Sequence, residues 1–79
     1  MSISKQIRAL LTLRGMKQTD IQGALGMASK QSLSNKFVHE RWSAEDLVKI
    51  AEACGCELAF LAPDGQVIKV QEEKTGPGA

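Results

Sequence analysis

The sequence has few of the side chains from which metal sites and nucleophilic active sites are built. Its 79 residues include one histidine, His39, and two cysteines, Cys54 and Cys56. These three side chains fall short of the four ligands that a structural zinc site requires. No combination of a serine or cysteine nucleophile with His39 has a plausible third member. We therefore expect no enzymatic activity, no metal ion and no organic cofactor.

Long apolar runs and aromatic side chains are also scarce. No uninterrupted apolar segment approaches the roughly 20 residues of a membrane-spanning helix, so we expect no membrane partner. Tyrosine is absent and aromatic residues make up 4% of the chain, which leaves no aromatic platform for stacking single-stranded nucleic acid. One residue separates Cys54 from Cys56, a spacing too tight for an easy disulfide. A reduced pair is typical of the cytosol, so we expect a cytoplasmic protein.

The small net charge of +1 hides an uneven distribution of charge along the chain. Residues 1–41 carry seven lysines and arginines against two acidic residues, a net charge of +5. Residues 42–79 carry three lysines against seven acidic residues, a net charge of −4. This asymmetry is typical of a protein whose basic part meets a polyanion. Chance scatter in a short chain is the alternative.

Apolar periodicity predicts a mainly α fold, with four helices followed by a β-hairpin. Ser29 and Ser43 are suitable caps for the third and fourth helices. Pro63, Asp64 and Gly65 form a turn signal between the two strands. The polar segment 71–79 is expected to be disordered. The predicted helices cover about residues 4–14, 17–25, 30–38 and 43–55, and the predicted strands cover residues 56–61 and 67–70.

The second and third predicted helices, within residues 18–38, have the pattern of a helix-turn-helix. In this motif the first helix braces against the DNA backbone and the second presents its first turns to base edges in the major groove. Leu33 and Phe37, four residues apart, give the third helix an apolar side. The segment between Asp20 and Glu40 contains no acidic residue, so nothing there would repel phosphates. The polar side, from which we expect base reading, carries Lys30, Gln31, Ser34 and Asn35.

Residues at characteristic spacings between Gly15 and Ala51 match the pattern of a known protein family. The set consists of Gly15-Met16-Lys17-Gln18, Ile21, Leu25-Gly26-Met27, Ser29, Leu33 and Leu47-x-x-Ile50-Ala51. With these residues the chain resembles the phage-repressor-like (Xre/Cro/C1-type) helix-turn-helix proteins over about residues 4–54. The resemblance implies a four-helix lambda-repressor-like DNA-binding domain, here residues 1–55, and a homodimeric transcriptional regulator of double-stranded DNA, most simply a repressor.

The resemblance also implies that Gln18 contacts a phosphate and braces Lys30. We expect further contacts to the DNA backbone from Lys17, Ser29, Lys36 and Arg41. Two features depart from the family pattern where the second and third helices touch. Gln22 stands where the family usually has a small residue, and the interval from Gly26 to Leu33 is one residue longer than usual. Both departures bear on the tilt of the third helix.

The predicted hairpin, residues 56–70, has apolar side chains on both faces. Leu58 and Phe60 lie on one face of the first strand, and Ala59 and Leu61 lie on the other. Because an isolated apolar hairpin is marginal in water, we expect it to pair with a second copy and form a homodimer on a palindromic site. One alternative is a hairpin folded back on the first and fourth helices of a monomer. Another is an antitoxin-like adaptor that uses the hairpin edge to bind a different protein. No small-molecule effector is evident.

Overall fold

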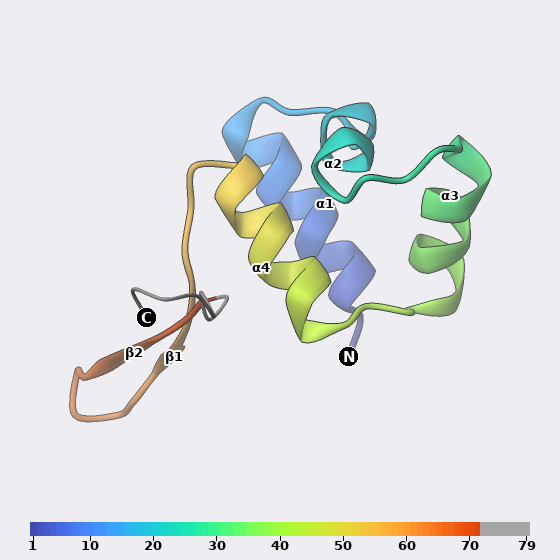
Figure 1. The fold of residues 1–79 in the computed structure, drawn as a ribbon. Coiled ribbons are helices and arrows are strands. Elements are labelled where there is room, and N and C mark those ends of the chain that lie inside the picture. Colours follow the sequence, from blue (N-terminus) through green and yellow to red (C-terminus); the bar gives the residue numbers. More distant parts are fainter. Residues whose placement is uncertain (72–79) are drawn as a thin grey trace, which may run out of the picture.

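The computed structural model describes residues 1–71, and it confirms a mainly α chain in which four helices precede a hairpin (Figure 1). The predicted disordered tail, apart from Gln71, lies outside the described residues. Within residues 1–71, every helix is too short or too polar to cross a membrane. The elements are α1 (Ile3–Arg14), α2 (Gln18–Ala24), α3 (Lys30–His39), α4 (Ala44–Ala53), β1 (Leu58–Leu61) and β2 (Val67–Val70).

The helices begin and end where local side chains satisfy their free backbone groups. The hydroxyl of Ser29 accepts from the Ser32 N–H at 3.2 Å and begins α3. Ser43 and Asp46 form a reciprocal capping box that begins α4. Gly15 takes the left-handed conformation after α1, with φ of 66°. These caps place the observed helix ends within about two residues of the predicted ends.

The first strand begins two residues later than predicted. The Cys56 N–H donates to the Ala51 carbonyl at 2.8 Å, and Gly55 has a φ of 70°. These two features close the end of α4 in the manner of a Schellman motif. The backbone of Cys56 therefore belongs to the helix end, and the ladder with β2 begins at Leu58.

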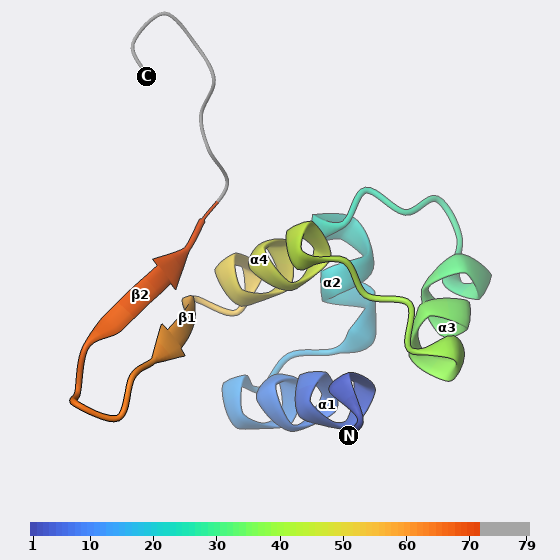
Figure 2. The same cartoon turned by 90° about the horizontal axis from the view of Figure 1, so that it is seen from below.

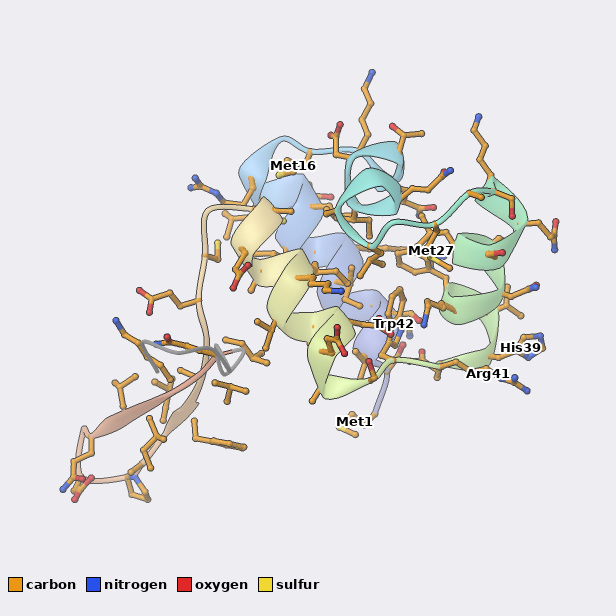
Figure 3. The ribbon with its side chains drawn as sticks, in the orientation of Figure 1. Met1, Met16, Met27, His39, Arg41 and Trp42 are labelled. Carbon is orange, nitrogen blue, oxygen red and sulfur yellow. The ribbon has the colours of Figure 1, made fainter. Side chains whose placement is uncertain are left out.

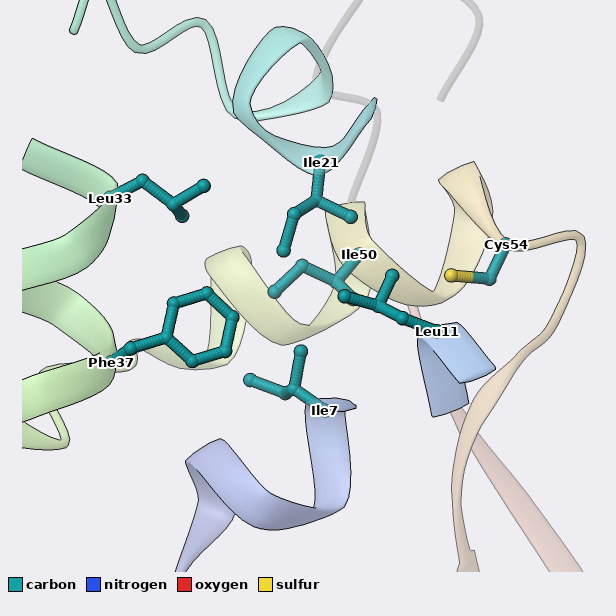
Figure 4. Packing of buried hydrophobic residues seen from close by; sticks show 7 residues of the cluster. All are labelled: Ile7, Leu11, Ile21, Leu33, Phe37, Ile50 and Cys54. Atoms are coloured by element: carbon teal, nitrogen blue, oxygen red, sulfur yellow. The ribbon is translucent and has the colours of Figure 1, made fainter. Parts of the chain in front are cut away.

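The core is formed by one buried side chain or more from each helix (Figure 4). Ile21 of α2 and Ile50 of α4 are at its centre, with 0% and 1% of their surface exposed. Leu33 and Phe37 enter from α3, as predicted, whereas Leu25 and Leu47 lie half-buried at the rim. The cluster consists of Ile7, Leu11, Ile21, Leu33, Phe37, Ile50 and Cys54.

The hairpin is antiparallel and stands beside the helices with its turn directed away from them (Figure 2). Its register pairs Leu58 with Val70 and Phe60 with Ile68, so these four side chains share one face. Gly65 has a φ of 91°, which satisfies the predicted turn. The outer half of the hairpin exposes large apolar side chains, namely Phe60, Leu61, Val67 and Ile68.

Candidate nucleic-acid interface

One side of α3 is fixed in the core and the other side faces solvent. Leu33 and Phe37 are 3% and 4% exposed, so they fix the rotation of α3 about its own axis. The predicted base-reading side chains are all exposed on the remaining surface of the helix. A helix held in this way presents its polar side chains in one fixed direction. The exposed set is Lys30, Gln31, Ser34 and Asn35.

Two of these side chains are coupled to each other. The Gln31 Nε2 donates to the Asn35 Oδ1 at 3.1 Å, across one turn of α3. Both amides are of the type that pairs bidentately with adenine in the major groove. The hydrogen bond orients the two amides together, so a change in either one also affects the other.

The two residues of the predicted brace lie at the same place between α2 and α3. Gln18, the first residue of α2, and Lys30, the first residue of α3, line the same hollow of about 290 Å³. Thr19, Ser34 and the core residue Leu33 line it as well. The contact between Gln18 and Lys30 that the resemblance implies stays a prediction.

Gln22 lines the same hollow, and a hydrogen bond holds its side chain there. Its side chain is half-buried, and its Nε2 donates to the Met27 carbonyl at 3.3 Å. The connection from Gly26 to Ser29 includes a positive φ of 68° at Gly26. The amide of Gln22 thus ties α2 to the connection that leads to α3.

Lys36 differs from the expectation that it lies free beside a phosphate. Its Nζ is 2.7 Å from the Asp46 Oδ2 and 3.3 Å from the Arg41 carbonyl. The side chains of Lys36 and Asp46 are 26% and 17% exposed. To reach a phosphate, Lys36 would have to leave this ion pair, so we assign it to the α3–α4 junction.

Ser29 is also engaged within the protein. Its hydroxyl caps α3 and lies 3.0 Å from the hydroxyl of Ser32. A contact from Ser29 to DNA would therefore come most simply from its backbone. Lys17 and Gln18 at α2, and Arg41 after α3, are exposed. Figure 3 shows Arg41 and His39 projecting from the end of α3.

A polar network that the sequence did not reveal joins the end of α3 to the start of α1. The buried hydroxyl of Ser4 donates to the Phe37 carbonyl at 2.8 Å and accepts from the Trp42 Nε1 at 3.1 Å. The carboxylate of Glu40 accepts from the Ser2 hydroxyl at 2.6 Å and from the Ser4 N–H at 3.0 Å. The Ser2 and Ser4 hydrogen bonds hold the pKa of Glu40 below its ordinary value. Glu40 is also the one non-glycine residue among those described with a positive φ, 53°.

Aromatic and cationic contacts complete this junction. The pattern before the fourth helix predicts that Trp42 packs onto that helix. The structure shows its ring edge-on against Phe37 of the preceding helix, with centroids 4.9 Å apart. The guanidinium of Arg8 lies 4.9 Å from the centre of the Phe37 ring. Trp42 is therefore a packing residue and not a free stacking surface for nucleic acid.

Arg14 and the two cysteines lie at the opposite end of the helical body. The Arg14 Nε donates to the Cys54 carbonyl at 2.9 Å, so this arginine also has a structural role. Burial raises the pKa of the Cys54 thiol. His39 is exposed at the end of α3, whereas Cys54 is buried after α4. Across residues 1–71, no three histidine, cysteine or acidic side chains converge into a group that could hold a metal ion.

Comparison of this chain with known protein families, curated proteins and solved structures finds no match.

Proposed function

We propose that this chain is a sequence-specific double-stranded DNA-binding transcriptional regulator. The observation that carries the proposal is α3 itself, which is anchored by Leu33 and Phe37 and presents an exposed polar face. Such a helix fits the B-DNA major groove, where lysine and amide side chains pair with base edges. The proposed base-reading residues are Lys30, Gln31, Ser34 and Asn35.

The surroundings of α3 are compatible with a polyanion. No acidic residue lies between Asp20 and Glu40. Lys17, Gln18 and Arg41 are exposed near its two ends, and we propose that they contact the DNA backbone. The carboxylate of Glu40 is tied back to the start of α1 by its hydrogen bonds with Ser2 and Ser4.

The regulator is proposed to act as a homodimer on a palindromic site, as a repressor that occupies its operator. Two recognition helices related by a two-fold axis read half-sites about 34 Å apart. The protein would then be cytoplasmic and associated with the nucleoid when it is bound to DNA.

A second candidate function is favoured by one observation. The hairpin exposes Phe60, Leu61, Val67 and Ile68, which also suits an antitoxin-like adaptor that binds another protein. Salt dependence separates the two functions, because DNA binding through several cations weakens steeply with salt and apolar docking does not.

Selection from a random pool of DNA duplexes tests the proposed function. The full chain should enrich a short palindrome with two half-sites about 10 base pairs apart. Affinity for that site should exceed affinity for scrambled DNA by about a thousandfold or more at physiological salt. Recovery of an unenriched pool would contradict sequence-specific binding.

A further inference from the structure

The molecule has a second apolar surface, separate from α3. A groove of about 230 Å³ lies between α1 and α4 and ends at the root of the hairpin. Its walls include Ile3 and Leu10 from α1, Leu47 and Ile50 from α4, and Leu58 from β1. A largely apolar groove of this kind favours an apolar occupant.

The hairpin continues this surface outward. Leu58, which lines the groove, shares a strand face with Phe60, two residues further along β1. Phe60 is paired with Ile68, and the two side chains are 69% and 60% exposed. Leu58 therefore connects the groove to the exposed Phe60–Ile68 pair of the hairpin.

We propose that a second copy of this chain covers this surface, with the Phe60 face of each hairpin in the α1–α4 groove of its partner. A two-fold axis near Leu58 reverses the order of groove and hairpin in the second copy. The Phe60 face of each hairpin then packs in the apolar groove of the other copy, so a single two-fold rotation buries the hairpin face and the groove of both copies. A different protein would have to supply both shapes.

The size of the surface agrees with a small, specific dimer interface. The two exposed side chains on the docking face of the hairpin, Phe60 and Ile68, present on the order of 250 Å² per chain, given 150–250 Å² for a large aromatic side chain. Two such hairpin faces and the groove walls that they cover amount to roughly 1,000 Å², the lower limit for a specific interface. Figure 1 shows α3 on the side of the helical body away from the hairpin, so the dimer leaves the candidate DNA-reading face open.

This inference rests on the proposed homodimer but not on DNA binding, so it is tested without DNA. Sedimentation velocity is measured on the full chain and on two matched pairs of variants. Phe60→Glu is compared with Leu61→Glu, since Leu61 lies on the opposite hairpin face. Leu10→Glu is compared with Leu13→Glu, since Leu13 is 80% exposed and is not part of the groove lining.

The parent, Leu61→Glu and Leu13→Glu chains should sediment as dimers. Phe60→Glu and Leu10→Glu should raise the dimer dissociation constant by about tenfold or more, because each places a charge in an apolar interface. A monomeric parent would overturn the inference. Equal increases in the dissociation constant for Phe60→Glu and Leu61→Glu would overturn it as well. So would a Leu10→Glu chain that dimerises like the parent.

A cross-linking experiment covers the case in which Leu10→Glu fails to fold. Cys56 is a native thiol in the groove, so a Phe60→Cys chain treated with a disulfide reagent, which is itself reduced to thiols, should form a disulfide between position 60 of one copy and Cys56 of the other. Leu61→Cys is the matched control and should not form this link. Links only between the two introduced cysteines would instead show hairpin-to-hairpin pairing and would overturn the inference.

The two proposals fail in different ways. A dimer with the predicted cross-link that enriches no DNA sequence would remove the regulator and keep the interface. A monomer that enriches a DNA site would remove the interface and keep DNA recognition.

Discussion

Lys36 and Asp46 form a 2.7 Å ion pair that joins the last turn of α3 to the first turn of α4. The same Asp46 carboxylate accepts from the Ser43 N–H at 3.1 Å, which completes the capping box of α4. One carboxylate thus fixes the start of α4 and the exit of the candidate recognition helix.

The ion pair predicts that Lys36, in the last turn of α3, and Lys17, before α2, behave differently on DNA. Lys17→Gln should reduce the slope of log affinity against log salt concentration by about 1, because an exposed phosphate contact is lost. Lys36→Gln should leave that slope unchanged and should lower the free energy of unfolding by about 1 kcal/mol. Salt titrations of both variants with the selected duplex, together with urea unfolding, measure both effects. A reduced slope for Lys36→Gln would show that the ion pair opens to contact phosphate.

The same carboxylate predicts a pH dependence of stability. Burial raises the pKa of Asp46, but the hydrogen bonds from Lys36 and Ser43 and the charge of Lys36 outweigh burial and hold the pKa below its ordinary value. A lowered folded-state pKa stabilises the fold above the unfolded-state pKa, and this stabilisation is lost as the pH falls. Thermal melting should therefore show declining stability as the pH is lowered from about 5 to about 3.

Asp46→Asn is the control for this pH dependence. The asparagine cannot ionise, so the variant should be less stable than the parent at neutral pH and should lose less stability on acidification. Glu40, whose pKa is lowered by Ser2 and Ser4, remains in both chains and accounts for part of the residual slope. Identical acid profiles for parent and variant would contradict the role assigned to Asp46.

Phe37 is predicted to be the main anchor of α3. It is 4% exposed, its ring makes a T-shaped contact with that of Trp42, and the Arg8 guanidinium lies over its face. Phe37→Ala should cost about 3–5 kcal/mol, enough to unfold much of so small a domain. Phe37→Leu, which conserves more volume, should cost about 1–2 kcal/mol and gives a measurable transition. Unchanged melting of both variants would mean that α3 does not pack in this way.

Ser4 is predicted to stabilise the chain far more than its size suggests. Ser4→Ala removes the donor to the Phe37 carbonyl and leaves the Trp42 N–H without its partner. The expected cost is about 2 kcal/mol, since buried polar groups would lose their hydrogen bonds. Ser34→Ala, on the exposed face of α3, should leave the free energy of unfolding within about 0.5 kcal/mol of the parent. Chemical denaturation of both variants compares the two positions, and equal stabilities would remove the assigned role of Ser4.

The elements of the fold were predictable because their signals are local. Leu33 and Phe37 show helical spacing, Ser29 and Ser43 are caps, and Gly65 marks the hairpin turn. The later start of β1 was missed because Cys56 has a strand-like neighbourhood but an N–H that closes α4.

The site was less predictable because its geometry depends on contacts distant in sequence. The sequence around Lys36 gives no sign of its ion pair, because its partner Asp46 is ten residues away and belongs to the next helix. The contacts of Ser4 with Phe37 and Trp42 span more than 30 residues, and no periodicity reveals them. The helical spacing of apolar residues predicts the exposed face of α3. The tertiary contacts determine which lysine and arginine side chains near it are held in ion pairs within the protein.

The central claim is that the exposed amides of α3 read DNA bases, and binding of two α3 variants tests it most directly. Affinity is measured for the parent, Gln31→Ala and Asn35→Ala on the selected duplex and on a scrambled duplex of equal length. Each variant should lose about 1–3 kcal/mol on the selected site and little on the scrambled one. The double variant should lose less than the sum of the single losses, because the two amides are hydrogen-bonded to each other. Equal losses on the selected and scrambled duplexes would contradict base reading by α3.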